Sequence, residues 1–175
     1  MRNIVLTVLA ATLLFAACTT HNQREKLLQE ITQSEKEIFS KEIDATLEES
    51  QHLMDLYLAF ADEFPQDSLA PEMLFYCASV AARSYQEKFA ITLYQRIYDE
   101  YPNHALRPTA LFCQALVYDD IMNDAEHAKP LYEQFLVMFP DDPDIEYVQQ
   151  RLEMVGMSPE EWLLHIQQFD DEDIE

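Results

Sequence analysis

Glycine and basic residues are both scarce in this chain of 175 residues, and each shortage restricts what it can do. A single glycine, Gly156, is too few for a phosphate-binding loop, which needs several glycines for close backbone approach. Tight β-hairpins also favour glycine at positive φ, so a hairpin-rich β fold is disfavoured. Only 11 Lys and Arg face 33 Asp and Glu, and this formal charge of −22 disfavours nucleic acid, whose phosphates need basic partners. The length fits one domain with a hydrophobic core.

The N-terminal segment is apolar but short. Arg2 precedes a run from Ile4 to Ala17, which is 14 residues long. A membrane-spanning helix needs about 20 apolar residues, so this run is too short to span a bilayer by itself. The combination of a basic start and a short apolar run predicts a secretory signal peptide over residues 1–17.

The end of this segment reads Phe15-Ala16-Ala17-Cys18 and resembles the lipoprotein box of bacteria. The resemblance implies cleavage before Cys18 and lipidation of that residue, followed by a lipidated linker over 18–22. Several acyl chains would anchor the protein firmly. Thr19 stands where some inner-membrane lipoproteins have Asp, and no acidic cluster follows directly, so the resemblance implies an outer-membrane lipoprotein facing the periplasm. The alternatives are an ordinary secretory signal and a short anchor with an incidental cysteine.

The body of the chain contains one pattern three times: Tyr-x-x-apolar-x-x-x-aromatic-Pro. The three aromatic-Pro pairs, with prolines 37 and 38 residues apart, are Phe64-Pro65, Tyr101-Pro102 and Phe139-Pro140. The tyrosines eight residues before each proline are Tyr57, Tyr94 and Tyr132, and the apolar residues five before are Phe60, Ile97 and Phe135. This spacing places the three positions on one helix face, and the proline ends the helix.

The opening halves of two of these units also match. The segment 71–75 corresponds to 108–112, and Ala78 corresponds to Ala115, all at a shift of 37. Ala90 and Ala128 each stand four residues before the repeated tyrosine. Small residues at these positions allow two antiparallel helices to approach closely, so each unit is predicted to be a helical hairpin.

Residues 45–155 resemble the tetratricopeptide repeat, a helix-turn-helix unit of about 34 residues. In the unit that starts at Pro71, the residues that match the family's small, aromatic and proline positions are Ala78, Ala90, Tyr94 and Pro102. The unit departs from the pattern in having Ala78 for the usual glycine, Leu74 for the usual tryptophan, and extra residues between hairpins. Such stretched units resemble those of periplasmic proteins of outer-membrane assembly and of the Tol-Pal system.

The resemblance implies an all-α fold, a right-handed α-solenoid of helical hairpins with a C-terminal capping helix pair. The helical domain is predicted over residues 23–168 and a disordered acidic tail over 169–175. The expected helices are 23–41, 45–63, 70–84, 86–100, 107–121, 124–138, 143–155 and one starting at Ser158. Their expected caps are a Thr46–Glu49 capping box, Asp124, Gly156 after a helix end, and Ser158 with Glu161.

The third unit has Val137-Met138 where the first two units have an Asp-Glu pair before the aromatic residue. Because apolar residues at a solvated position need a cover, the last helices are predicted to bury them. The candidates for this cover are Trp162, Leu163 and Ile166. Solenoids need such atypical ends to close their stacking face.

Residues with catalytic or metal-binding chemistry are sparse. The five histidines form no i, i+4 pair, and the segment 141–144 lacks the loop glycine and distal glutamate of a calcium-binding EF-hand. Cys77 and Cys113 are predicted to be buried free thiols, with a disulfide as the alternative, and neither belongs to a nucleophilic triad. We therefore expect no enzyme activity, no cofactor, no metal and no small-molecule substrate.

A binding groove is implied by the resemblance, because the first helices of tetratricopeptide hairpins line a concave surface. The lining it implies comprises Glu72, Phe75, Ser79, Ala82 and Arg83 from one unit and Thr109, Phe112, Leu116 and Asp119 from the next. Phe75 and Phe112 would be the apolar anchors of a peptide site. The alternative is that both rings pack between hairpins.

Acidic residues concentrate toward the C-terminus. Residues 111–175 contain 17 Asp and Glu but only two bases, Lys129 and Arg151. A basic partner docking there is one interpretation, and a solubilising surface is the other. The resulting hypothesis is an outer-membrane-tethered scaffold that binds a protein or peptide partner, and its alternative is an accessory subunit of an envelope assembly or uptake complex.

Overall fold

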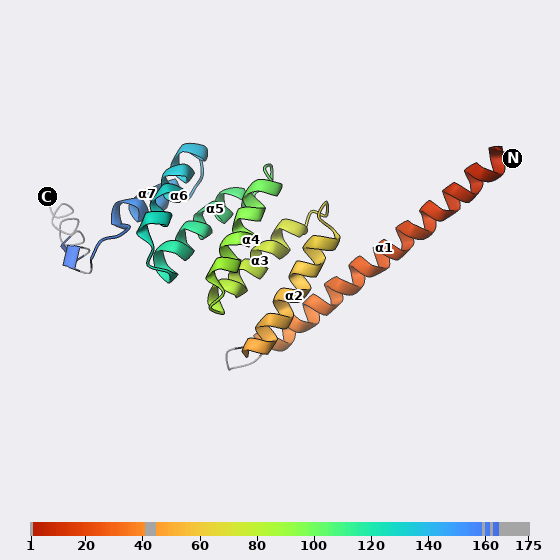
Figure 1. Cartoon of the computed structure of the whole chain (residues 1–175), viewed down its shortest axis with the longest axis horizontal. Helices are drawn as coiled ribbons and strands as arrows, with labels where there is room; N and C mark the ends of the chain where they lie inside the picture. The colour runs from red at the N-terminus through yellow and green to blue at the C-terminus, as the bar shows by residue number, and fades with distance from the viewer. Residues whose placement is uncertain (1, 41–44, 159, 162, 165–175) are drawn as a thin grey trace. The chain divides into compact units, whose positions relative to one another are not determined.

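The computed structural model describes residues 2–40, 45–158, 160–161 and 163–164 (Figure 1). Within these residues every regular element is a helix and there is no strand, which confirms the all-α class. The chain forms two compact units, residues 1–77 and 78–175. Helix α3 runs through the boundary between them.

The helices agree with the predicted ranges except near the N-terminus, and Figure 1 labels those that are α-helices. They are α1 (Arg2–Phe39), α2 (Leu47–Glu63), α3 (Ala70–Arg83), α4 (Glu87–Glu100), α5 (Leu106–Leu116), η1 (Val117–Ile121), α6 (Ala125–Met138) and α7 (Ile145–Met154). Helix α1 continues through the predicted signal segment and through residues 18–22, so the predicted linker is helical. The predicted acidic tail at 169–175 lies outside the described residues.

The predicted N-terminal caps are confirmed. At α2 the amide of Glu49 donates to Thr46 Oγ1 at 3.2 Å, and the amide of Thr46 donates to Glu49 Oε2 at 2.9 Å. Asp124 Oδ1 accepts the amide of His127 at the start of α6. Ser158 and Glu161 exchange the same pair of bonds, at 3.2 and 2.8 Å, where helical residues resume after α7. Each cap satisfies amides that the helix itself leaves unpaired.

The aromatic residue before each proline ends its helix in the same conformation. Phe64, Tyr101 and Phe139 have φ of −123°, −122° and −132° and ψ of 55°, 60° and 56°. Each donates its amide to the carbonyl four residues earlier and then leaves the α region, as a residue before proline must. The repeated sequence pattern is therefore a repeated local structure.

The loops that follow these aromatic residues also repeat. Asp67, His104 and Asp142 each donate their amide to the carbonyl of the aromatic residue three positions earlier, at 2.9 to 3.1 Å. The side chain of each then accepts the amide two residues on, from Leu69, Leu106 and Asp144. The third loop leads into α7, so α7 begins where the first helix of a fourth hairpin would begin.

The repeated positions are buried, as predicted. The tyrosines and apolar residues of the repeat, all at most 4% exposed, are Tyr57, Tyr94, Tyr132, Phe60, Ile97 and Phe135. The small residues of the repeat, all fully buried, are Ala78, Ala90, Ala115 and Ala128. The aromatic stripe is thus core, and its alanines leave room for neighbouring helices.

In the first unit, α1 packs along α2. Of the apolar stripe predicted for the first helix, Ile31 is buried, whereas Leu27, Leu28 and Ile38 are partly exposed. The hydroxyl of Tyr57 on α2 donates to Glu35 Oε1 on α1 at 2.6 Å, so a polar bond joins the two helices beside their apolar contact.

In the second unit, α4 packs on α5, α5 on α6, and α6 on α7. The core of these helices consists of Tyr98, Leu111, Phe112, Ala115, Ala128, Tyr132, Phe135 and Val148. Arg107 at the start of α5 lies 4.3 Å over the Tyr98 ring and donates from Nε to the Tyr98 carbonyl. Val148 is the fully buried residue through which α7 packs into this core.

The predicted helix over 107–121 is confirmed in its extent, but its last five residues, Val117–Ile121, form the π-helix η1 instead of continuing the α-helix. The amide of Met122 donates to the carbonyl of Val117, five residues earlier, at 3.0 Å. A π turn takes up one residue more than an α turn. The interval from Ala115 to Ala128 is one residue longer than that from Ala78 to Ala90, so the π turn absorbs the extra residue of the 38-residue repeat.

The prediction that the last helices cover Val137 and Met138 is wrong. Val137 is 79% exposed, Met138 is 46% exposed, and Leu163, a proposed cover, is itself 55% exposed. Helix α7 does pack on α6, but through Val148 against the core face instead. Trp162 and Ile166 lie outside the described residues.

Gly156 has the role that its place in the sequence predicted. It follows α7 with φ of 79°, a conformation that is costly for residues with a Cβ. A Cβ at this position would lie 3.0 Å from the Cβ of Ala125, the first residue of α6. The glycine therefore allows α7 to end against the start of α6.

We expect Gly156→Ala to destabilise the protein by about 1–2 kcal/mol, because it adds both backbone strain and a close contact. Thermal unfolding followed by circular dichroism measures this as a Tm lower by about 2–4 °C per kcal/mol. Gly156→Asn is the matched variant, since Asn tolerates positive φ, and it should lose less stability than Gly156→Ala. An unchanged Tm for Gly156→Ala would contradict the assigned role.

Candidate functional site

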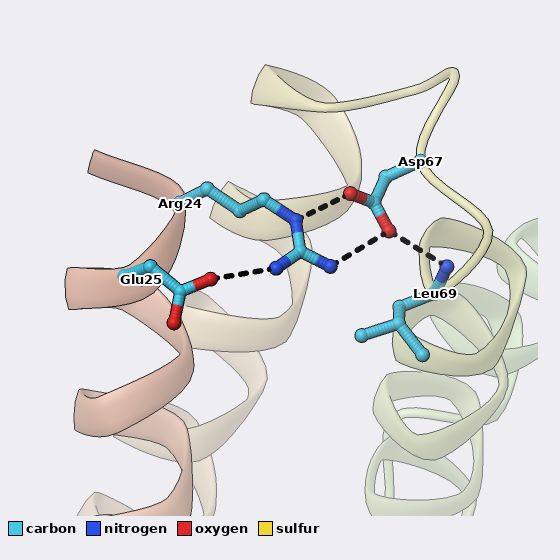
Figure 2. Close-up of polar contacts among 4 residues, drawn as sticks. All are labelled: Arg24, Glu25, Asp67 and Leu69. Carbon is cyan, nitrogen blue, oxygen red and sulfur yellow. Dashed lines mark hydrogen bonds and ion pairs between the residues drawn. The ribbon is translucent and has the colours of Figure 1, made fainter. Parts of the chain in front are cut away.

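The predicted lipidation site, Cys18, lies on helix α1, and its side chain is outside the described part of the structure. Six residues further along this helix, Arg24 reaches the loop after α2 (Figure 2). Its Nε donates to Asp67 Oδ2 at 2.5 Å and its Nη2 to Asp67 Oδ1 at 3.3 Å, while Nη1 donates to Glu25 Oε1 at 2.9 Å. Two hydrogen bonds of this kind fix the orientation of the guanidinium relative to the carboxylate as well as the distance between them. The helix that carries Cys18 is thereby joined to the first repeated loop.

Asp67 serves two contacts at once. Its Oδ1 also accepts the amide of Leu69, which is the loop bond shared by all three repeats. Its side chain is only 16% exposed. The hydrogen bond from Arg24 holds the pKa of Asp67 below its ordinary value, because the guanidinium stabilises the charged carboxylate.

This lowered pKa predicts a pH dependence. A carboxylate with a lower pKa in the folded state stabilises the protein above its unfolded-state pKa, about 3.9, and loses that contribution as the pH falls toward the folded-state value. We expect Asp67→Asn, whose amide oxygen can still accept from Leu69, to cost about 1 kcal/mol at neutral pH. Urea unfolding at neutral and acidic pH should show that the cost shrinks on acidification.

Lys26→Met is the matched control for this prediction. Lys26 lies on the same helix and pairs with Glu30 at 3.5 Å, but its side chain is 74% exposed. Exposed pairs of this kind contribute little, so this variant should be nearly neutral. Equal losses in Asp67→Asn and Lys26→Met would show that the Arg24–Asp67 contact is no stronger than a solvent-exposed ion pair.

The part of the predicted groove on α3 is partly accessible. Phe75 belongs to the first unit, is partly buried, and meets the ring of Tyr76 edge-on at 6.4 Å. In the second unit, Ser79 shares a hydrogen bond of 3.2 Å with the hydroxyl of Tyr94. Ala82 is partly buried and Arg83 is exposed.

The part of the predicted groove on α5 is different. Phe112 is only 7% exposed, and its ring contacts those of Tyr132, Phe135 and Tyr147 at 6.0, 6.1 and 5.6 Å. The expectation that Phe112 is an accessible peptide anchor is therefore wrong, and the alternative of packing between helices holds for this residue. Leu116 packs against the same core.

Asp119 is also engaged internally. It accepts the hydroxyl of Tyr132 at 2.9 Å and Arg151 Nη2 at 2.5 Å, so its carboxylate supports the fold of the second unit rather than facing a partner. Arg151 contacts Asp120 as well, which joins α7 to the π-helix η1. Burial lowers the pKa of Arg151, but the hydrogen bonds to the two carboxylates outweigh it and the pKa is raised.

Two residues of α7 were not predicted. The ring of Tyr147, which is 49% exposed, contacts that of Phe112, and Arg151 binds Asp119, so both residues join α7 to the preceding helices of the second unit. These two residues were missed because the unit that α7 opens has no closing aromatic-Pro pair, which marks the other units.

The two cysteines of the helical region are free thiols, and Cys77 is buried as predicted, whereas Cys113 is only partly buried. Cys77 is fully buried and donates weakly to the carbonyl of Met54, and burial raises its pKa to about 12. Burial likewise raises the pKa of Cys113 to about 11. Since the thiolate is the nucleophilic form, neither group is poised to react at neutral pH.

We expect both thiols to react with a thiol reagent at least about a hundredfold more slowly in the native protein than in the urea-unfolded chain. The measurement uses a Cys18→Ser chain so that only Cys77 and Cys113 contribute. Cys77→Ala and Cys113→Ala variants assign any reaction that is seen. A thiol that reacts stoichiometrically and fast in the native state would reverse this conclusion.

No family model and no curated protein matches this chain. Among the described residues, no helix has both the length and the apolarity that crossing a membrane requires. The same part of the chain contains no group of three or more His, Cys, Asp or Glu that could hold a metal ion. The functional interpretation therefore depends on the repeated loops, the α1 contacts and the accessible surfaces.

Proposed function

We propose that this protein is a membrane-tethered scaffold that binds another protein in the bacterial cell envelope. In this proposal lipidated Cys18 anchors it to the outer membrane on the periplasmic side. The helices form a right-handed solenoid of hairpins similar to tetratricopeptide repeats, closed by a C-terminal helix pair. The observation that carries the proposal is the threefold repetition of one helix end and one loop, from Phe64 to Leu69, Tyr101 to Leu106 and Phe139 to Asp144.

The repeated loop supports the solenoid because equal loops give successive hairpins equal local geometry. Units of this kind bury their faces against their neighbours, and they use the remaining surface to bind extended segments of other proteins. Arg83 and Tyr76 are exposed on α3, and Tyr147 is half-exposed on α7. Each unit thus offers its own exposed side chains to a partner, Tyr76 in the first unit and Arg83 and Tyr147 in the second, whereas Phe112 is buried.

A role in binding rather than catalysis is supported by the chemistry of the titratable groups. The two thiols have raised pKa values, so neither is poised to react at neutral pH. The partly buried ion pair of Asp119 with Arg151 joins elements of the fold, as suits a protein that acts by binding.

The course of α1 supports a stiff tether. The helix is continuous from the position of Cys18 to Phe39, and the six residues from Cys18 to Arg24 correspond to about 9 Å of helix. The Arg24–Asp67 contact would then hold the scaffold close to the lipid anchor instead of at the end of a flexible chain.

The test of the anchor is metabolic fatty-acid labelling of cells that produce the full-length protein. Wild type and Cys77→Ala, the control for loss of a cysteine, should be labelled and should fractionate with the outer membrane. Cys18→Ala should be unlabelled and should be released from that fraction. If wild type and Cys18→Ala label equally, the lipid tether is excluded.

A second candidate, an accessory subunit with a permanent partner, is favoured by the exposure of Val137 and Met138 on α6. Adjacent apolar residues on a surface are suited to a lasting interface. Purification in mild detergent distinguishes the two roles. A stoichiometric partner that is lost in a Val137→Asp/Met138→Asp variant supports the subunit, whereas weak and varied partners support the scaffold.

A further inference from the structure

Two adjoining hollows lie between α1 and α2 in the first unit, with volumes of about 330 and 490 Å³. Both are lined by Ser34, Glu37 and His52, so they form one continuous groove. The first hollow extends to Thr46, Glu48 and Glu49 at the start of α2, and the second extends along α1 to Lys26. We name this surface the α1–α2 groove.

Ser34 is the polar residue at the centre of this groove. It is 7% exposed and lines both hollows, yet within the described residues its hydroxyl makes no hydrogen bond. The hydroxyl of Thr32 on the same helix, by contrast, is paired, because it donates to the carbonyl of Leu28 at 2.8 Å. Among the described residues, the fully buried side-chain N and O atoms without a partner belong to Gln114 and Arg151, so the Ser34 hydroxyl opens onto the hollow instead of being enclosed. Ser34 therefore offers an unused donor and acceptor to whatever enters the groove.

The groove is acidic. Its lining contains four glutamates, Glu30, Glu37, Glu48 and Glu49, and one lysine. Lys26 lies 3.5 Å from Glu30, which neutralises that end of the groove. Glu49 uses one oxygen in the capping box of α2, and Glu37 accepts one bond from Gln33 at 2.6 Å. The unbalanced negative charge therefore lies around the first hollow, between Glu37 and Glu48.

The dimensions of the groove limit the ligand. From Lys26 to Ile38 the groove follows 13 residues of α1, and the 12 steps between these two residues correspond to about 18 Å of helix. An extended chain covers this distance with about five residues. The glutamates are spread along the groove, and the described residues gather no three His, Cys, Asp or Glu at one point. This distribution matches several separate cations on one chain better than a single metal ion.

We propose that the α1–α2 groove binds a short, extended and basic peptide segment of a partner protein. A Lys or Arg side chain of the segment lies between Glu37 and Glu48, and a polar group of the same segment pairs with Ser34. Anionic lipid headgroups and nucleic acid are repelled by the same carboxylates. The proposal rests on the scaffold function and names the chemistry of its partner. The sequence pattern had suggested a basic partner for residues 111–175, whereas the groove is formed by α1 and α2.

The experiment measures fluorescence anisotropy of a labelled pentapeptide, Lys-Ala-Lys-Ala-Lys with blocked ends, on titration with full-length protein in mild detergent. We expect saturable binding that weakens as salt is added. Glu37→Gln and Glu48→Gln should each weaken binding about five- to tenfold, because each removes a charge-assisted bond. Ser34→Ala should weaken it about two- to tenfold without loss of Tm, because its hydroxyl has no partner to lose in the unbound protein.

The controls are charge-matched. Glu133→Gln and Glu146→Gln remove exposed carboxylates from α6 and α7 and should leave the affinity unchanged. A pentapeptide with Glu in place of Lys should not bind. The proposal is overturned if the Lys peptide does not bind, if the groove and control variants weaken binding equally, or if stoichiometric Ca²⁺ displaces the peptide. Such a result leaves the scaffold function standing, because that function is decided by lipid labelling and by the partners that co-purify.

Discussion

The rest of the structure depends on one local constraint, the proline that follows an aromatic residue at the end of a helix. Proline cannot donate a hydrogen bond, and it keeps the preceding residue out of the α region. Phe64, Tyr101 and Phe139 consequently end three helices with nearly equal backbone angles. Their carbonyls then receive the amide three residues on, and the chain turns into the next helix at the same point each time.

Variation around this constant loop gives each unit its own properties. In the first unit Asp67 of the loop is also bound by Arg24, so the loop holds α1. In the second unit the extra residue of the longer repeat is absorbed by the π-helix η1, and two of its carboxylates are bound by Arg151 of α7. Both variations recruit an arginine, in a chain that has only 11 basic residues. Arg24 and Arg151 thus each join two elements that are distant in sequence.

Helix α1 combines the two proposed roles of the protein. It carries Cys18, it is held to the first loop by Arg24, and from Lys26 to Ile38 it forms one wall of the α1–α2 groove. A basic segment bound in this groove would lie alongside the same helix that bears the lipid. Binding and tethering would then be coupled through one stiff element, because an uninterrupted helix transmits orientation along its length.

The sequence by itself determined the repeated helix ends, the caps, and the buried tyrosines and alanines. It also determined that Gly156 adopts a positive φ after α7. These features depend on contacts within a few residues. Only the tertiary structure decided what Phe112, Asp119 and Ser34 do. The ring of Phe112 packs against that of Tyr147, and Asp119 accepts a hydrogen bond from Arg151, which lies 32 residues later in the sequence. Ser34 lines a hollow whose other wall is formed by α2. No periodic pattern encodes such pairings, since they depend on how helices far apart in the chain come to lie together.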